Sequence, residues 1–181
     1  MKKVIFLDRD GTINVEKSYL HKWEDFEFEK NVIEGLKELK KMGYEFIVVT
    51  NQSGIARGYY SEEDLKALNS EMVKELKKHD IDILECYYCP HHPDKGLEEY
   101  RKDCDCRKPN PGMLLEGIKK YSVDIKNSFM IGDKKSDLEA GKKAGLKSIL
   151  VLTGYGKNVE DDVKEEYLVA KDLLDISKII K

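Results

Sequence analysis

The sequence predicts an α/β fold built on a doubly wound, mostly parallel sheet. Short apolar, β-branched segments alternate along the chain with amphipathic segments of helical period. The apolar segments are nearly continuous hydrophobic runs, which is typical of parallel strands covered on both faces. Repeated β-α units of this kind form right-handed crossovers, and ligands then bind beyond the carboxyl ends of the strands.

Six segments are expected to form strands and five to form helices. The strands share an apolar composition and are Val4–Leu7, Phe46–Thr50, Ile83–Tyr88, Phe129–Ile131, Ser148–Leu152 and, with the weakest pattern, Tyr167–Ala170. The helices share apolar residues at helical spacing and are expected to begin at Asn31, Ser61, Pro111, Leu138 and Leu173. The first should open with a capping box, because Glu34 follows Asn31 by three residues, and stop at Gly43.

Length and charge narrow the class of protein. A chain of 181 residues corresponds to one domain, here expected to span residues 1–181. Its 32 basic and 35 acidic residues give a net charge of −3, whereas a surface that binds nucleic acid is normally basic. Every apolar run is far shorter than the ~20 residues of a membrane helix, and the N-terminus lacks a signal-peptide pattern. We therefore expect a cytoplasmic protein that binds neither nucleic acid nor membranes.

Two carboxylates, Asp8 and Asp10, follow the first expected strand. Side chains two residues apart at the end of a strand can face the same side, which suits binding of Mg²⁺. The pair also suits a division into nucleophile and general acid/base, and aspartate is a recognised acceptor of phosphoryl groups. The alternative is a strand that runs into a solvated Asp-Gly turn.

Three more groups of polar residues lie at or just after the ends of expected strands. Residues 50–53 carry hydroxyl and amide groups that could bind phosphate oxygens. Arg107 and Lys108 place two cations before a helix, and cations of this kind bind phosphate. Asp133 could complete the magnesium site, while Asp137 could orient the intervening lysine or a metal-bound water. A polar turn, a solvated charge pair and a helix cap are the respective alternatives. Because parallel strands end at one edge, we expect these groups to form one site.

The segment Cys89–Gly112 breaks the alternation of strands and helices. It carries all four prolines, three of the four cysteines and two of the four histidines. A loop of this length needs its own reason to be ordered, and two tight ligand pairs can enclose a structural zinc ion. The expected ligands are Cys89, His91, Cys104 and Cys106, so that the zinc loop covers about residues 89–106. His92 competes with His91 and Cys86 with Cys89 as ligands, and free thiols are the alternative to zinc.

Taken together, these residues resemble the motifs of a known family. Asp8-Arg9-Asp10-Gly11-Thr12, Thr50, Lys108 and Gly132-Asp133 with Asp137 resemble the four-motif signature of haloacid dehalogenase-like (HAD-like) phosphatases. The resemblance implies that Asp8 is the nucleophile, that Asp10 is the general acid/base, and that Thr50 and Lys108 stabilise the phosphoryl group. It also implies a magnesium ion held by Asp8, the backbone carbonyl of Asp10, and Asp133. The short gap before the first helix implies a capless Rossmannoid fold.

The residues of the zinc loop resemble those of a smaller group within this family. Cys89–Asp94 with Cys104–Met113 is similar to the D,D-heptose 1,7-bisphosphate phosphatases and to their histidinol-phosphate phosphatase relatives. Asn51–Tyr59 and Gly132–Gly141 are similar to the heptose enzymes alone. This resemblance implies removal of the 7-phosphate of D-glycero-D-manno-heptose 1,7-bisphosphate, in the biosynthesis of nucleotide-activated heptose. A histidinol-phosphate phosphatase and a phosphoacceptor signalling domain are the alternatives.

The same resemblance implies a pocket for a small sugar bisphosphate. Its expected lining is Arg9, Glu16, Lys17, Ser18, Tyr19, Asn51, Gln52, Ser53, Arg107 and Lys134. Arg107 should bind the distal phosphate, which only a bisphosphate substrate carries. Trp23 and His21 are expected to pack the loop without a role in the chemistry. A capless phosphatase of this size is expected to be a monomer.

Overall fold

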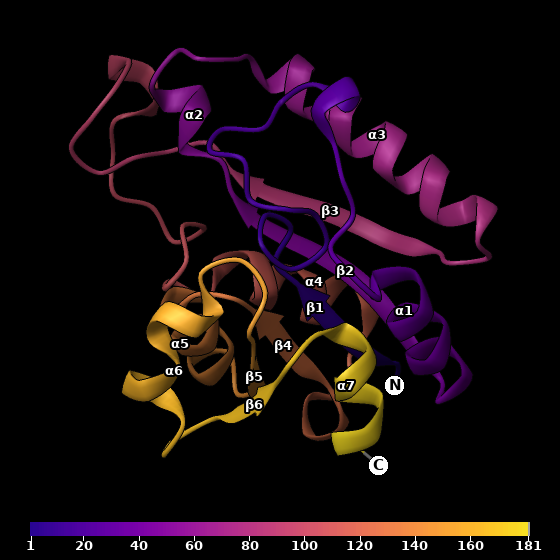
Figure 1. The fold of residues 1–181 in the computed structure, drawn as a ribbon. Coiled ribbons are helices and arrows are strands. Elements are labelled where there is room, and N and C mark those ends of the chain that lie inside the picture. Colours follow the sequence, from indigo (N-terminus) through magenta and orange to yellow (C-terminus); the bar gives the residue numbers. More distant parts are fainter. Residues whose placement is uncertain (181) are drawn as a thin grey trace.

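Six parallel strands form one sheet in the computed structural model of the protein, which describes residues 1–180. Lys181, the last residue of the expected domain, lies outside the described residues. The strands are β1 (Lys3–Leu7), β2 (Tyr44–Asn51), β3 (Ile83–Cys89), β4 (Phe129–Gly132), β5 (Lys147–Val151) and β6 (Leu168–Ala170). Their order in the sheet is β3-β2-β1-β4-β5-β6 (Figure 1). All six strand predictions are confirmed within a few residues, and the sheet is parallel throughout.

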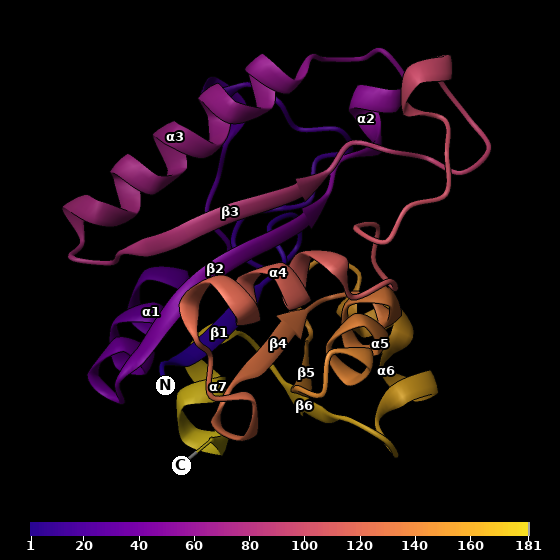
Figure 2. The same ribbon diagram turned by 180° about the vertical axis from the view of Figure 1, so that it is seen from behind.

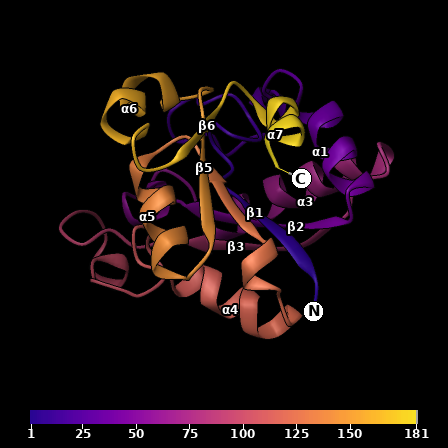
Figure 3. The ribbon, with the colours of Figure 1, turned by 90° about the horizontal axis from the view of Figure 1, so that it is seen from below.

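Helices cover both faces of the sheet (Figures 2 and 3). The helices are α1 (Val32–Lys41), α2 (Ser53–Ala56), α3 (Glu62–Lys78), α4 (Gly112–Tyr121), α5 (Lys135–Lys143), α6 (Gly156–Val163) and α7 (Leu173–Ile179). Alternate residues of β1 point to opposite faces. Ile5 and Leu7 pack in a core cluster with α1, α3 and α7, whereas Val4 and Phe6 pack with α4 and α5. Strand β3 lies at the edge of the sheet, so most of its residues are only half-buried.

At some helix starts, tertiary contacts override the capping that the local sequence predicts. The capping box predicted at Asn31 is wrong: this residue has a left-handed backbone, with φ of 63°, and its side chain makes no capping bond. Asn31 Nδ2 instead donates to Asp172 Oδ2 at 2.7 Å, a partner far away in the sequence. Ser61, in contrast, begins α3 with a complete capping box shared with Asp64. Helix α5 begins at Lys135, before the predicted Leu138, and the sequence did not predict α2 or α6.

The sheet topology selects the place where a ligand can bind. Strands β1 and β4 are neighbours, but the chain continues from β1 toward β2 and β3, and from β4 toward β5 and β6. The loops after these two strands therefore diverge, and the crevice between them is the usual binding site of doubly wound sheets. Asp8 N donates to Ile131 O at 2.9 Å, which keeps the first residue after β1 in register with β4. Among the helices described, none has the length and apolar character needed to cross a membrane.

Candidate active site

Three buried carboxylates meet in this crevice. Asp8 follows β1, Asp133 follows β4 and Asp137 lies in the first turn of α5, and their oxygens lie within 4.8 Å of one another. Lys108 enters from the loop after β3. Its Nζ lies 2.8 Å from Asp8 Oδ1 and 2.6 Å from Asp137 Oδ1, and it donates to Val49 O at 2.7 Å. The topology thus brings together the residues predicted from three separate motifs.

The electrostatics of the cluster favour a bound cation. Burial and the charges of Asp8 and Asp137 raise the pKa of Asp133 to about 8, and burial and Asp8 raise the pKa of Asp137 to about 6. Burial by itself would lower the pKa of Lys108, but the charges of Asp137 and Asp8 raise it. Asp133 Oδ1 is buried and, among residues 1–180, has no hydrogen-bond partner. An acceptor left open between several carboxylates can coordinate a hard divalent cation.

Asp10 is held by donors from three directions. Arg9 Nη2 lies 3.0 Å from Asp10 Oδ1, Asn14 Nδ2 donates to the same oxygen at 3.0 Å, and Gln52 Nε2 donates to Oδ2 at 2.8 Å. Burial would raise the pKa of Asp10, but the charge of Arg9 and these hydrogen bonds lower it below its usual value. The three donors therefore fix the orientation of the carboxyl group.

The side chain of Arg9 does not line the pocket, contrary to expectation. It is 0% exposed and donates to Asn69 Oδ1 in α3 at 3.0 Å and to Leu20 O at 3.2 Å. The residue follows Asp8 directly, and the chain here turns so that Asp10 faces the site while Arg9 points under it. In this structure Arg9 orients Asp10.

Gln52 joins Asp10, the acid/base candidate, to Thr50, the candidate for binding the phosphoryl group. Its Nε2 donates to Thr50 Oγ1 at 2.8 Å as well as to Asp10, and its Oε1 accepts from the Tyr60 hydroxyl at 2.6 Å. The carboxylate of Asp10 only accepts hydrogen bonds, so Gln52 presents its nitrogen to Asp10 and its oxygen to Tyr60, whose hydroxyl donates. The amide orientation of Gln52 is thereby fixed, with the nitrogen toward Asp10.

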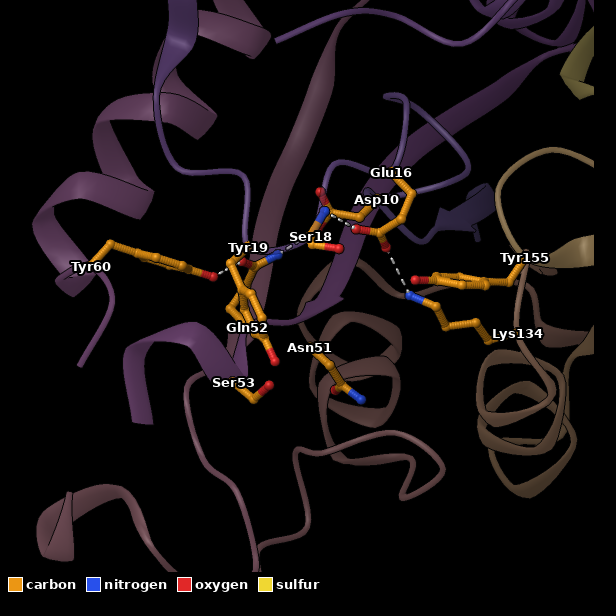
Figure 4. A pocket seen from close by; sticks show the side chains of 10 residues that line it. All are labelled: Asp10, Glu16, Ser18, Tyr19, Asn51, Gln52, Ser53, Tyr60, Lys134 and Tyr155. Atoms are coloured by element: carbon orange, nitrogen blue, oxygen red, sulfur yellow. Dashed lines mark hydrogen bonds and ion pairs between the residues drawn. The ribbon is translucent and has the colours of Figure 1, made fainter. Parts of the chain in front are cut away.

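Asp10 lines a pocket of about 310 Å³ (Figure 4). It is lined by Asp10, Glu16, Ser18, Tyr19, Asn51, Gln52, Ser53, Tyr60, Lys134 and Tyr155. A smaller recess beneath it reaches Asp8, Lys108 and Thr50, and the two spaces share Asp10, Asn51 and Lys134. The arrangement suits a phosphate group in the recess and the rest of the molecule in the outer pocket.

Seven of the ten residues expected in the substrate pocket line it. They are Glu16, Ser18, Tyr19, Asn51, Gln52, Ser53 and Lys134. The other three, Arg9, Lys17 and Arg107, do not line the pocket. Lys17 is exposed and donates to Asp25 O at 2.8 Å. Arg107 donates to His91 O at 3.0 Å, which holds it to the cysteine-rich loop. The pocket also contains two tyrosines that the sequence did not predict, Tyr60 and Tyr155.

Cys89, His91, Cys104 and Cys106 form a second cluster, as predicted. Cys104 Sγ lies 3.5 Å from Cys89 Sγ and 3.3 Å from Cys106 Sγ, and His91 Nδ1 lies 3.6 Å and 3.5 Å from Cys89 and Cys106. A tetrahedral zinc ion with bonds of about 2.3 Å holds its sulfur ligands ~3.8 Å apart, so the four atoms have the right size of cage. Hydrogen bonds with Cys89, Cys104 and His91 lower the pKa of Cys106, and the thiolate is the form in which cysteine binds zinc.

The two rival ligands lie outside this cluster. His92 Nδ1 accepts from the backbone nitrogens of Asp94 and Lys95 at 3.1 Å, so that ring completes a turn. Cys86 lies within β3, and burial raises the pKa of its thiol to about 12. The structure thus distinguishes between the rival ligands that the sequence left open, because His92 lies in a turn and Cys86 lies in β3, both outside the cluster.

Contacts with α3 hold the outer part of this loop. Both oxygens of Glu62 accept from tyrosine hydroxyls, one from Tyr88 in β3 and one from Tyr100 in the loop. Gly96 lies against the end of α2, with φ of 96°, and an added Cβ would lie 2.0 Å from Ala56 O. The loop is therefore packed against the protein even between its two pairs of candidate ligands.

Replacing Lys108 by Met should destabilise the metal-free protein by about 3 kcal/mol at neutral pH, because Asp8 and Asp137 then lose their buried cation. The deficit should shrink as the pH falls toward about 6, since the loss of Lys108 raises the pKa of Asp137 above the value of about 6 that it has beside the lysine, and its protonated form needs no cation. Urea unfolding with chelator on both sides of that pH measures it. Lys142→Met, which removes only an exposed ion pair with Glu166, is the control; an equal effect of both variants at neutral pH would contradict the prediction.

Comparisons with known proteins agree with this geometry. Residues 105–176 match the HAD-hydrolase-like family model. The chain is 49% identical over 180 residues to a D-glycero-alpha-D-manno-heptose-1,7-bisphosphate 7-phosphatase of Photorhabdus laumondii, covering 99% of this chain and 97% of that protein. It is 46% identical over 178 residues to the D-glycero-beta-D-manno-heptose-1,7-bisphosphate 7-phosphatase of Escherichia coli K12, covering 98% and 93%. Among solved structures, the D,D-heptose 1,7-bisphosphate phosphatase of B. bronchiseptica, complexed with magnesium and phosphate, superposes with a TM-score of 0.86 at 30% identity and covers 98% and 97% of the two chains.

Proposed function

This chain belongs to the haloacid dehalogenase-like phosphatases, and we propose that it removes the 7-phosphate of D-glycero-D-manno-heptose 1,7-bisphosphate through an aspartyl-phosphate on Asp8. The proposal rests mainly on one observation, which is that the small inner recess and the larger outer pocket adjoin each other and share three lining residues. The inner recess contains Asp8, Thr50 and Lys108, and the outer pocket has the size and the polar lining for a sugar.

The chain's own residues can perform both halves of the reaction. In the first half, a carboxylate oxygen of Asp8 attacks phosphorus, the bond from phosphorus to the sugar oxygen breaks, and Asp10, once protonated, gives its proton to that oxygen. In the second half, Asp10 takes a proton from water, whose oxygen attacks phosphorus and releases phosphate and free Asp8. Lys108 and Thr50 stabilise the negative charge on the phosphoryl oxygens during both transfers.

We propose two metals with different roles. Mg²⁺ would be held by Asp8, Asp133 and the backbone carbonyl of Asp10, and the buried open acceptor of Asp133 supports this assignment. When bound, it neutralises charge on the transferring phosphoryl group. Zn²⁺ would be held by Cys89, His91, Cys104 and Cys106 as a closed structural site, supported by the mutual distances of these four residues.

We further propose that residues 1–181 act as one domain, as a monomer in the cytoplasm, in the biosynthesis of nucleotide-activated heptose. The support for a single domain is that strands from the beginning, middle and end of the chain share one sheet. Strand β1 near the N-terminus lies between β2 and β4, and β6 near the C-terminus is the edge strand opposite β3.

The test is magnesium-dependent release of phosphate from three substrates measured side by side. These are the α and β anomers of D-glycero-D-manno-heptose 1,7-bisphosphate, and histidinol phosphate. We expect strong preference for a bisphosphate, and the preferred anomer identifies the pathway branch, since relatives of both specificities are equally similar at 49% identity. Preference for histidinol phosphate would contradict the substrate assignment. A phosphoenzyme that persists in the absence of substrate turnover would instead support a phosphoacceptor domain.

A further inference from the structure

Tyr155 reaches the outer pocket from the turn between β5 and α6. Its backbone nitrogen donates to Asp133 Oδ2 at 2.8 Å, and Thr153 Oγ1, two residues earlier, donates to Gly11 O at 2.7 Å. Gly154 between them has φ of 52°, and an added Cβ would lie 2.2 Å from Asp133 Oδ2. The turn is therefore attached to the catalytic loops by bonds that do not involve the tyrosine ring.

The ring of Tyr155 is free to make contacts of its own. It lines the outer pocket beside Lys134, whose Nζ lies 5.0 Å from the ring centroid and 3.3 Å from Glu16 Oε2 (Figure 4). A cation at this distance from an aromatic ring is attracted to it, so the ring helps to orient Lys134. The residue as a whole is 42% exposed, which is unusual for a large side chain whose backbone is fixed within an active site.

A second exposed tyrosine, Tyr19, lines another side of the same pocket. Tyr19 is 41% exposed, and its ring contacts Tyr59 at a centroid distance of 4.8 Å and the guanidinium of Arg57 at 5.8 Å. In Figure 4 Tyr19 and Tyr155 lie on different sides of the pocket, with polar side chains between them. A pocket with polar groups between aromatic rings suits a sugar, whose hydroxyls need partners and whose C–H groups pack on rings.

We propose that Tyr155 is a specificity-determining residue whose ring packs against the carbon skeleton of the sugar and orients Lys134 toward it. This inference rests on the proposed function, because it takes a sugar phosphate as the occupant of the outer pocket. The phosphate to be transferred would occupy the inner recess, which Tyr155 does not line. Lys134, which lines both spaces, keeps its ion pair with Glu16 when the ring is removed, so the contribution of Tyr155 is to the affinity for the sugar and leaves the transfer step itself unchanged.

The experiment compares wild-type protein, Tyr155→Ala and Tyr155→Phe with the preferred heptose bisphosphate. In Tyr155→Ala we expect KM to rise by about tenfold with kcat within roughly twofold, because an aromatic contact is lost while the backbone bond to Asp133 remains. Tyr155→Phe keeps the ring and should keep the wild-type KM. Inhibition by inorganic phosphate should be equal in all three proteins, since phosphate occupies the inner recess.

Two outcomes overturn the inference. If KM for Tyr155→Ala equals that of Leu168→Ala, which shortens a 50% exposed side chain on β6, the ring does not bind the sugar. If phosphate inhibition weakens in parallel with the rise in KM, Tyr155 acts through Asp133 and the ring contact is wrong. Wild-type protein that hydrolyses no sugar phosphate would contradict the proposed function and the inference together, whereas active wild-type protein with an unchanged variant contradicts the inference alone.

Discussion

Replacing Asp8 by Asn is expected to lower turnover by on the order of 10⁴-fold or more, because an amide cannot act as the attacking carboxylate. The fold should be retained. Asn has almost the same volume, and Lys108 keeps Asp137 at 2.6 Å and the backbone oxygen of Val49 at 2.7 Å. Removing one of three clustered carboxylates also relieves the repulsion that raises the pKa of Asp133, so the metal-free variant should be at least as stable as wild type.

The measurement pairs phosphate release with denaturant unfolding in the presence of chelator. Asp124→Asn, which changes a carboxyl in the turn before β4, at the amino ends of the strands, is the matched control and should behave as wild type in turnover. Mass spectrometry of protein quenched during turnover should find a phosphoryl group on wild type and none on the variant. Near wild-type activity of Asp8→Asn would show that another group is the nucleophile.

Replacing Cys104 by Ser is expected to release the zinc ion and to loosen the loop that carries Lys108. The affected ligand lies four residues before the lysine, and Cys106 only two, so the cage and the catalytic cation share one short segment. A displacement of about 1 Å in a positioning group can lower turnover by up to roughly 10²-fold. We therefore expect both lower activity and lower stability.

Cys86→Ser is the matched control, since Cys86 is also half-buried and lies outside the cage. Zinc content by elemental analysis, melting temperature and phosphate release should fall together in Cys104→Ser and stay near wild type in Cys86→Ser. A Cys104→Ser protein that retains one zinc per chain and full activity would contradict the ligand assignment. Loss of zinc with full activity would show that the cage does not position Lys108.

The sheet and the clustering of Asp8 with Asp133 could be predicted because both depend on the path of the backbone. Runs such as Phe129–Ile131 are too apolar to lie anywhere but between helices, and a residue that follows a parallel strand must emerge at the carboxyl edge. Asp8 and Asp133 therefore meet once β1 and β4 are neighbours. The zinc-ligand candidates were predictable for a similar reason, because closely spaced ligand pairs in one loop need little other structure to meet.

Side-chain direction within loops was not predictable. Arg9 is adjacent to two site residues in sequence, yet a partner on α3, Asn69, draws it beneath the pocket. Arg107 is next to Lys108 but bonds to the backbone of His91. In both cases the competing partner is distant in sequence, so no local pattern indicates it. Tyr155 could have been suspected from its place after β5, by the same strand-end argument that found Asp133.

The cluster of Cys89, His91, Cys104 and Cys106 also has an evolutionary consequence. Its two ligand pairs bracket the stretch from His92 to Asp103, and the polypeptide enters and leaves that stretch at fixed points. Insertions or deletions at the exposed residues 101–103, which lie outside the contacts of Gly96 and Tyr100, can change the surface without shifting Lys108, because the two ligand pairs hold both ends of the stretch. Natural variants of this enzyme should therefore differ in length at these residues, and a peptide tag placed there should be tolerated.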